Sequence, residues 1–345
     1  MKKSNSNALP YEIQVAAYNL SVPWALDISD EGTLYFTERS GNIKRIEEEN
    51  SEPQTIFLFT EPFIATGEGG LMGLALDPEF SQNHYIYVMH TYMEDDNQIS
   101  NRVVRLIVQD GEAFIDKILI DKIPGGQIHN GGRIKIGSDQ KLYITTGDAG
   151  DSVLAQDINS LAGKILRIEL DGGIPEDNPF EDSPVYSWGH RNPQGLAWNT
   201  NNILYASEHG PMGHDEINII VPGGNYGWPL TQRYEEPSDI VVQRPLIHSG
   251  VDTWAPSGIA FIEDGPWQNG LLVTNLRGNQ LLAMSLNEDG TQITDNRPWF
   301  QNTFGRLRDV IQDTDGTIYF STSNLDGRGN PGAGDDRIIR LRPMA

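Results

Sequence analysis

A histidine flanked by glycines is the first residue whose setting could support chemistry. His129 lies in the sequence GGQIHNGGR, just before a short β-rich run. Glycine lets a ligand approach the backbone closely, and histidine can take up a proton near neutral pH. Asp148 ends the next run, so antiparallel pairing of the two runs would bring its carboxylate to the imidazole, orient the ring and raise its basicity. The alternative is a turn histidine that hydrogen-bonds locally.

Arginines form a second group of candidate site residues. Arg191 and Asn192 come directly before an expected strand, and a buried arginine needs an anionic or carbonyl partner. Arg277 follows another run, while Arg306 and Arg308 alternate on one expected strand, so that both side chains face the same way. Several arginines directed at one channel of an acidic protein suggest a small ligand with carboxylates. The alternative for Arg191 is pairing with a core carboxylate, and the alternative for the later arginines is an Arg–Asp network that joins blades.

A third group combines carboxylates with turn backbone. It comprises Ser207 to Pro211, the pair Asp215 and Glu216, and the segment from Gly223 to Pro229. Carboxylate and carbonyl oxygens are hard ligands of the kind that Ca²⁺ takes. Ordinary Asx turns and loops would have the same composition, so both interpretations stay open at this point.

Composition removes several classes of protein. The 345 residues include 25 Lys and Arg against 48 Asp and Glu, a net charge of −23, and no Cys. Such a chain would repel nucleic acid, and it can form no disulfide, zinc-thiolate site or thiol nucleophile. No apolar run approaches the roughly 18 residues of a membrane span. Residues 1–10 carry charge without the apolar stretch of a signal peptide, and we expect them to be disordered or left over from expression.

A sixfold repeat with a period near 50 residues determines the expected architecture. Each copy has a turn, a short β-rich run, a second turn and a closing run rich in Ile, Val, Leu and Arg. The central runs are 33–37, 85–88, 141–145, 203–206, 270–273 and 317–320, and the closing runs are 42–46, 102–106, 164–168, 216–220, 280–284 and 337–341. Runs of this length between Gly, Asp and Asn turns are typical of strands. Six four-stranded units predict an all-β, six-bladed β-propeller; a pair of β-sandwiches would not explain the repeat.

The repeat also predicts how the ring closes. The last copy ends near Leu341 without a fourth strand, whereas an unassigned run, Tyr11 to Ala17, precedes the first copy. We expect that run to complete the last blade, so that residues 11–345 form a single propeller domain. Inner strands and their loops converge on one end of a propeller axis, where a pocket forms.

The segments that carry these residues together resemble the soluble quinoprotein glucose dehydrogenase and aldose sugar dehydrogenase family. The resemblance runs in order from about Pro23 to Leu341 and is strongest in 189–197 and 223–229, with support from 131–133, 147–148, 215–218 and 306–311. It implies a propeller that binds pyrroloquinoline quinone (PQQ) with Ca²⁺ against the quinone. The cofactor then supplies the redox chemistry, which explains why no cysteine, flavin motif or dinucleotide-binding loop is needed.

The resemblance also implies a role for each candidate residue. His129 would take the proton from the sugar C1 hydroxyl while hydride passes to the quinone, and Asp148 would orient it. Arg191 would stabilise developing negative charge beside the quinone oxygen, with Asn192 next to it. The residues expected to hold the cofactor further are Glu68, Arg277, Arg306 and Arg308, with the arginines on its carboxylates.

Metal and substrate residues follow from the same resemblance. Gly210 and Pro211 would offer backbone carbonyls to a catalytic Ca²⁺ that acts as a Lewis acid. Glu216 and the Tyr226 carbonyl would belong to a second, structural Ca²⁺. Trp254 would border the sugar pocket.

Four departures from the glucose dehydrogenase members favour the aldose sugar dehydrogenase branch. Arg277 replaces Lys, Glu68 replaces Gln, and Ile128 replaces an Asp before the base. The loop from Leu230 to Thr253 is short, whereas larger members use long loops there for dimer contact and substrate enclosure. We therefore expect a monomer with broad sugar specificity.

The predicted reaction is oxidation of small aldose sugars to the lactone with an external electron acceptor. Family members act outside the cytoplasmic membrane, so we expect an extracytoplasmic protein whose export signal is missing here. Two rival functions stay open: a calcium-dependent propeller lactonase, with His129 and Asp148 activating water, and a non-catalytic propeller that binds a partner or glycan.

Overall fold

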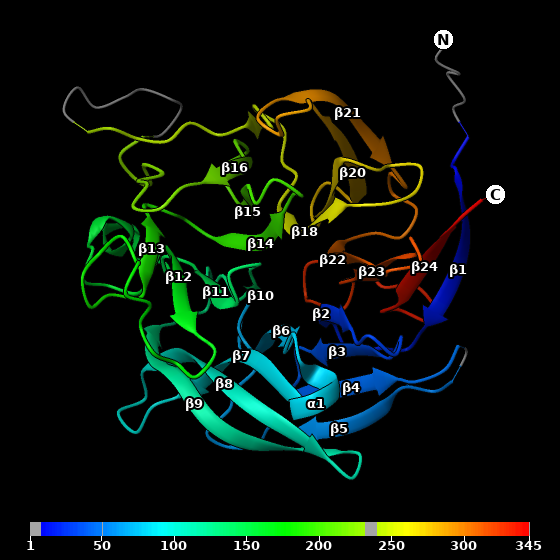
Figure 1. Cartoon of the computed structure of the whole chain (residues 1–345), viewed down its shortest axis with the longest axis horizontal. Coiled ribbons are helices and arrows are strands. Elements are labelled where there is room, and N and C mark those ends of the chain that lie inside the picture. The colour runs from blue at the N-terminus through cyan, green and yellow to red at the C-terminus, as the bar shows by residue number, and fades with distance from the viewer. Residues whose placement is uncertain (1–7, 50, 232–239, 345) are drawn as a thin grey trace.

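Six four-stranded antiparallel sheets surround a central axis in the computed structural model (Figure 1). The structure describes residues 8–49, 51–231 and 240–344. Blades one to three contain β2 (Pro23–Ile28), β3 (Leu34–Glu38), β4 (Asn42–Ile46) and β5 (Gln54–Leu58); β6 (Leu71–Leu76), β7 (Tyr85–Met93), β8 (Ile99–Gln109) and β9 (Glu112–Pro124); and β10 (Ile134–Ile136), β11 (Lys141–Thr146), β12 (Lys164–Glu169) and β13 (Val185–Trp188).

The other three blades repeat the pattern. They contain β14 (Pro193–Trp198), β15 (Leu204–Glu208), β16 (Glu216–Ile220) and β17 (Ile247–His248); β18 (Pro256–Ile262), β19 (Gly270–Asn275), β20 (Gln280–Leu286) and β21 (Ile293–Trp299); and β22 (Leu307–Gln312), β23 (Ile318–Thr322), β24 (Ile338–Pro343) and β1 (Tyr11–Ala17). The predicted all-β, six-bladed propeller is confirmed. The central and closing runs of the repeat correspond to the second and third strands of each blade.

The N-terminal strand closes the ring, as predicted. β1 pairs with β24 in antiparallel register from Tyr11 opposite Pro343, and the two strands lie side by side (Figure 1). Leu9 packs against the hydrophobic cluster of the last two blades, and the Pro10 carbonyl accepts a hydrogen bond from Met344 N at 3.1 Å. Residues 1–7, within the segment expected to be disordered, lie outside the described residues.

Blade four differs from expectation in its outer strand. The segment from Leu230 to Thr253 was expected to be loop throughout, but Ile247 and His248 pair with Glu216 and Ile217 as β17. Two residues are too few to show an alternating pattern, which is why the sequence gives no signal for this strand. Residues 232–239 of the same segment lie outside the described residues.

Among the residues that the structure describes, helices occur only in short connections. They are the four-residue α1 (Phe80–Asn83) and a 3₁₀ turn at Ser152–Gln156. Within the described ranges, the helices are too short to cross a membrane.

Inner strands of neighbouring blades pack very closely around the axis. A Cβ on Gly73 in β6 would lie 2.3 Å from the Gly132 carbonyl oxygen, so only glycine fits there. Further along the axis, fully buried Arg133 pairs with Asp309 at 2.7 Å and donates to the Gln194 carbonyl at 2.9 Å. This network joins blades three, four and six and gives the adjoining site a rigid base.

Candidate active site

Two loops of each blade meet at the same end of the ring. The first strand of a blade begins where its antiparallel second strand ends, so the loop entering the first and the loop leaving the second are neighbours. Residues that precede first strands include Glu68, His129, Arg191 and Arg306; residues that follow second strands include Arg39, Asp148, His209, Arg277 and Asp326. Apart from Asp148, these residues line one cavity of about 920 Å³. The repeat therefore builds the site from every blade.

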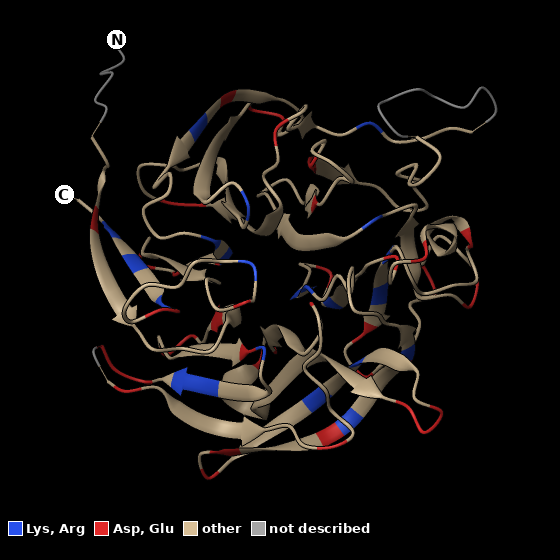
Figure 2. Ribbon diagram, turned by 180° about the vertical axis from the view of Figure 1, so that it is seen from behind, with Lys and Arg blue, Asp and Glu red and all other residues tan. Residues whose placement is uncertain are grey.

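The cavity is strongly cationic in an otherwise acidic protein. Figure 2 shows basic segments around the central opening and acidic segments in many outer loops. The lining contains six arginines, Arg39, Arg191, Arg277, Arg306, Arg308 and Arg328, and three carboxylates, Glu68, Asp215 and Asp326. A charge surplus of this sign favours an anionic ligand.

His129 and Asp148 are in direct contact. The distance from His129 Nδ1 to Asp148 Oδ1 is 2.7 Å, and the Asp148 side chain is only 2% exposed. Asp148 also accepts hydrogen bonds from Gly150 N and from the Trp228 indole, each at 2.8 Å. Burial tends to raise the pKa of Asp148, but its contacts with His129, Gly150 and Trp228 outweigh burial and keep that pKa below its usual value. An ionised Asp148 requires a proton on Nδ1, which leaves Nε2 as the proton acceptor.

The backbone of His129 is held as firmly as its ring. His129 has a φ of +55°, a left-handed conformation that costs energy for a residue with a side chain. Its N–H donates to Glu68 Oε2 at 2.9 Å, and its carbonyl accepts from Ala149 N at 3.0 Å. A Cβ on Gly147 would lie 2.0 Å from the His129 carbonyl oxygen. Glycine at position 147 therefore allows the loop of Asp148 to pack directly on the histidine.

Arg191 and Asn192 present buried nitrogen atoms that lack partners. Arg191 donates through Nη1 to the His209 carbonyl at 3.3 Å, and Asn192 Oδ1 accepts from Gly131 N at 3.0 Å. In the described part of the chain, Arg191 Nε, Asn192 Nδ2 and His209 Nε2 are buried without a hydrogen-bond partner. Burial lowers the pKa of Arg191 and lowers that of His209 to about 3. Buried unpaired polar atoms are costly, so the two that belong to residues of the cavity wall, Arg191 Nε and His209 Nε2, indicate a bound polar ligand. Asn192 is fully buried and is not among the residues that line the cavity.

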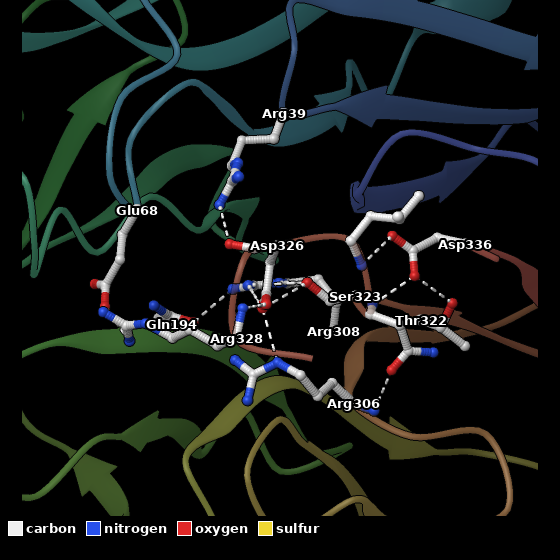
Figure 3. A network of polar contacts seen from close by, with 12 residues as sticks. Arg39, Glu68, Gln194, Arg306, Arg308, Thr322, Ser323, Asp326, Arg328 and Asp336 are labelled. Atoms are coloured by element: carbon white, nitrogen blue, oxygen red, sulfur yellow. Dashed lines mark hydrogen bonds and ion pairs between the residues drawn. The ribbon is translucent and has the colours of Figure 1, made fainter. Parts of the chain in front are cut away.

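Asp326 organises the late arginines (Figure 3). Its Oδ2 lies 2.8 Å from Arg306 Nε and 3.5 Å from Arg308 Nη2, and its backbone carbonyl accepts from Arg39 Nη1 at 3.4 Å. Arg308 also donates to Gln194 Oε1 at 3.1 Å, and burial lowers its pKa to about 10. The ion pairs of Asp326 with Arg306 and Arg308 lie within blade six, and the contacts with Arg39 and Gln194 join this network to blades one and four. Both arginines lie on the cavity wall.

The position of Arg306 corrects one detail. The sequence suggested that it shares a strand with Arg308, but β22 begins at Leu307 and Arg306 immediately precedes it. Its backbone N–H donates to Asn324 Oδ1 at 2.9 Å instead of joining the ladder. Both guanidinium groups nevertheless converge on Asp326.

Arg39, Asp326 and Arg328 were missed by the sequence analysis. Arg39 and Asp326 follow the second strands of their blades, as Asp148 does. That shared position in the repeat could have identified Arg39 and Asp326 as candidate site residues. Arg277 holds the equivalent place in blade five, and it is exposed where this cavity meets a neighbouring cleft.

The residues expected to bind calcium fall into two adjoining cavities. Gly210 and Pro211 line both the central cavity and a neighbour of about 470 Å³, whereas Glu216 and Tyr226 line only the neighbour. The Tyr226 hydroxyl donates to the Ile219 carbonyl at 2.6 Å. The predicted calcium ligand of Tyr226 is its backbone carbonyl, which this hydrogen bond does not involve. Across the described ranges, no three His, Asp or Glu side chains cluster in a way that could hold a metal ion.

Trp254, like Asn192 and Asp148, does not line the central cavity. Its neighbours Thr253 and Ala255 do so, while the Trp254 side chain packs against the hydrophobic cluster of blades four and five. Its backbone N–H donates to Asp215 Oδ2 at 2.6 Å. Asp215 thereby fixes the start of the loop that carries Thr253 and Ala255 into blade five.

Comparison with known proteins identifies the family. A family model described as glucose/sorbosone dehydrogenase matches residues 20–339. Quinoprotein glucose dehydrogenase B of Acinetobacter calcoaceticus is 37% identical over 259 residues, 66% of this chain, and the match spans about half (54%) of that protein. Aldose sugar dehydrogenase YliI of Escherichia coli K12 is 30% identical over 91% of both chains.

A solved structure supports the same assignment. The PQQ-bound form of aldose sugar dehydrogenase from Streptomyces coelicolor is 37% identical, covers 96% of this chain and 98% of its own, and superposes with a TM-score of 0.87. The family model and this structure both extend over nearly the whole ring. The chain therefore belongs to the glucose/sorbosone dehydrogenase family.

Proposed function

We propose that the protein is a PQQ- and calcium-dependent dehydrogenase that oxidises aldose sugars of several kinds at the C1 hydroxyl to the lactone. The observation that carries this proposal is the His129–Asp148 pair, with His129 on the wall of a cavity that also bears six arginines. Family membership and the PQQ-bound relative support it.

The residues of the cavity fit PQQ. The cofactor carries three carboxylates, and the lining has three more arginines than carboxylates. The unpartnered Arg191 Nε and His209 Nε2 belong to lining residues and are polar atoms that a quinone with ring nitrogens and oxygens could satisfy. We assign Arg277, Arg306 and Arg308 to its carboxylates. When bound, PQQ supplies a two-electron acceptor for hydride from the substrate carbon.

Side chains of the protein accept the proton and stabilise the negative charge that develops during the reaction. His129 Nε2 accepts the proton of the C1 hydroxyl as the C1–H electron pair leaves, so that a C1 carbonyl, and hence the lactone, is formed. Asp148 holds Nδ1 and stabilises the resulting imidazolium. Arg191, whose guanidinium carbon lies 5.3 Å from the Trp228 ring centre, is a fixed positive charge that stabilises negative charge in the cavity.

Calcium is assigned to backbone carbonyls and one carboxylate. Gly210 and Pro211 would hold a catalytic ion through their carbonyls, and Glu216 with the Tyr226 carbonyl would hold a structural one, since hard oxygens are the ligands that Ca²⁺ takes. Asp215 Oδ1 accepts from Gly210 N at 2.9 Å and so fixes the loop of the first pair.

The lactonase alternative has less support. Such a site binds its metal through carboxylates and amides along the axis, but Arg133, paired with Asp309, and Arg308, which contacts Gln194, lie there. A binding module would have no use for an oriented histidine–aspartate pair.

Reconstitution tests the proposal directly. The protein is mixed with PQQ and Ca²⁺, freed of excess cofactor by gel filtration, and assayed for glucose oxidation with an artificial electron acceptor. We expect retained quinone absorbance and turnover that a chelator abolishes. Loss of the quinone on the column together with no turnover would refute the assignment.

We also propose an extracytoplasmic, monomeric enzyme with an external electron acceptor. The family resemblance and the short segment between Leu230 and Thr253 support this proposal. Cell fractionation and light scattering after gel filtration check location and oligomeric state.

A further inference from the structure

We propose that Glu68 is a positioning residue for His129, and that Arg328 holds Glu68 in place by reaching over from blade six. The inference rests on the proposed function, because it gives His129 the part of the base. It concerns contacts that are independent of the cofactor, so it can be tested on the protein alone.

Glu68 holds the histidine segment at two points. Its backbone N–H donates to the Gln127 carbonyl at 2.9 Å, and its Oε2 accepts from His129 N at 2.9 Å. A Cβ on the preceding Gly67 would lie 2.1 Å from the Gln127 carbonyl oxygen, so the loop of blade two is packed directly onto blade three. The carboxylate therefore stabilises the left-handed backbone that directs His129 into the cavity.

Arg328 holds the Glu68 carboxylate through an ion pair that reaches from blade six to blade two. Its Nη1 lies 2.6 Å from Glu68 Oε1, although blades six and two are separated by blade one (Figure 3). The Arg328 backbone N–H donates to Asp326 Oδ1 at 2.9 Å. Asp326, which pairs with Arg306 and Arg308, therefore also holds the backbone of Arg328. A continuous path of contacts runs from Asp326 through Arg328 and Glu68 to His129 N.

Both oxygens of Glu68 are therefore already occupied within the protein. Burial tends to raise the pKa of Glu68, but the His129 N–H, Arg328 and the nearby histidines outweigh burial and hold it below its usual value. The charged and titratable groups that act on Glu68 are Arg39, His129, Arg191, His209, Arg308 and Arg328. An ionised, doubly engaged carboxylate is suited to holding a neighbour and less suited to binding a cofactor directly, the role first predicted for it.

Four single variants and one double variant separate these roles. Glu68→Ala removes the acceptor for His129 N, Glu68→Gln keeps an acceptor oxygen without the charge, and Arg328→Ala removes only the ion pair. Arg337→Ala is the matched control, since Arg337 lies in the same blade and pairs with Asp335 instead. The double variant Glu68→Gln/Arg328→Ala shows whether Arg328 acts through Glu68.

Hydrogen exchange in the cofactor-free protein is the first readout. We expect the His129 amide to exchange about tenfold faster or more in Glu68→Ala, because a charge-assisted hydrogen bond is lost. Arg328→Ala should give about a two- to fivefold increase, as for a partly exposed ion pair, and Arg337→Ala none. Unchanged exchange in Glu68→Ala would overturn the proposal whether or not the protein oxidises sugars.

Turnover of the reconstituted enzyme is the second readout. Arg328→Ala should lower kcat by about two- to fivefold in the native background and have no effect in the Glu68→Gln background. The acid limb of kcat against pH should move to lower pH in Glu68→Gln, which removes a negative charge near the imidazolium, and to higher pH in Arg328→Ala, which removes a positive one. Equal losses of kcat in both backgrounds, with reduced PQQ affinity, would assign Arg328 to the cofactor instead and overturn its part in the proposal.

Discussion

Asp148 and Glu68 hold different atoms of the same histidine. Asp148 accepts from the ring at Nδ1, and Glu68 accepts from the backbone N–H. Trp228, from the segment that follows β16, donates its indole N–H to Asp148 Oδ2 and so prevents that carboxylate from rotating. With both ends fixed, His129 can present only Nε2 to a substrate, which is the arrangement that a general base requires.

Replacing His129 tests that assignment. His129→Ala should lower kcat by roughly 10²–10⁴, the usual contribution of a general base, because a proton acceptor is lost while the arginines of the cavity stay in place. PQQ should still be retained on gel filtration, and added imidazole should restore part of the rate. A variant that keeps full turnover would show that another group takes the proton.

The loop between β11 and β12 shows how an element positions the site. It begins with Gly147 and Asp148 and leads to Lys164, the first residue of β12. The buried Lys164 ammonium donates to the carbonyls of Leu154, Ala155 and Ala162 at 2.7–3.1 Å. Three carbonyls around one ammonium fix the far part of the loop. Gly147 fixes its beginning, because no side chain fits between it and His129.

Replacing Gly147 tests the role of this loop. In Gly147→Ala the new Cβ would meet backbone atoms of His129 at 2.0 and 2.3 Å, so the loop must move, and we expect a loss of about 1–3 kcal/mol of stability as in an overpacked core together with a large fall in kcat. The control is Gly32→Ala, at a turn with a φ of +81° and open space around it. It should cost about 1–2 kcal/mol from backbone strain and leave kcat unchanged. Equal kcat values in the two variants would contradict the role of the loop.

Much of this arrangement could be predicted from the sequence, and what could not be predicted has a physical reason. The repeat and the turn residues predict the blades, and two antiparallel strands of one blade bring Asp148 to His129. Gln194 of blade four contacts Arg308, and Arg39 of blade one contacts the Asp326 carbonyl; spacing along the chain gives no distance for such contacts between blades. Asp326 and Arg328 follow β23 in a loop rich in Gly and Asn, and that composition is equally typical of an ordinary turn.

The whole ring is needed to assemble the cavity. Each of the six blades contributes at least one lining residue, and the last and first blades bring residues from opposite ends of the sequence together. Asp326 and Arg39 meet across the boundary between the last and first blades, which exists only because β1 and β24 close the ring. The residues that represent blades one to six in the lining are Arg39, Glu68, His129, Arg191, Arg277 and Arg306.

Closure of the ring can be tested at Tyr11 in β1. Tyr11 is 2% exposed, and its ring centre lies 4.5 Å from that of Trp267 in blade five. Tyr11→Ala should cost about 3–5 kcal/mol, the usual loss for truncating a buried aromatic side chain, and should lower the urea midpoint. Ile13→Ala is the control on the same strand: Ile13 is 43% exposed, so about 1 kcal/mol or less is expected. Because the cavity spans the closing blade, release of bound PQQ should follow the same urea transition in Tyr11→Ala; cofactor retained well past unfolding would show that the site survives an open ring.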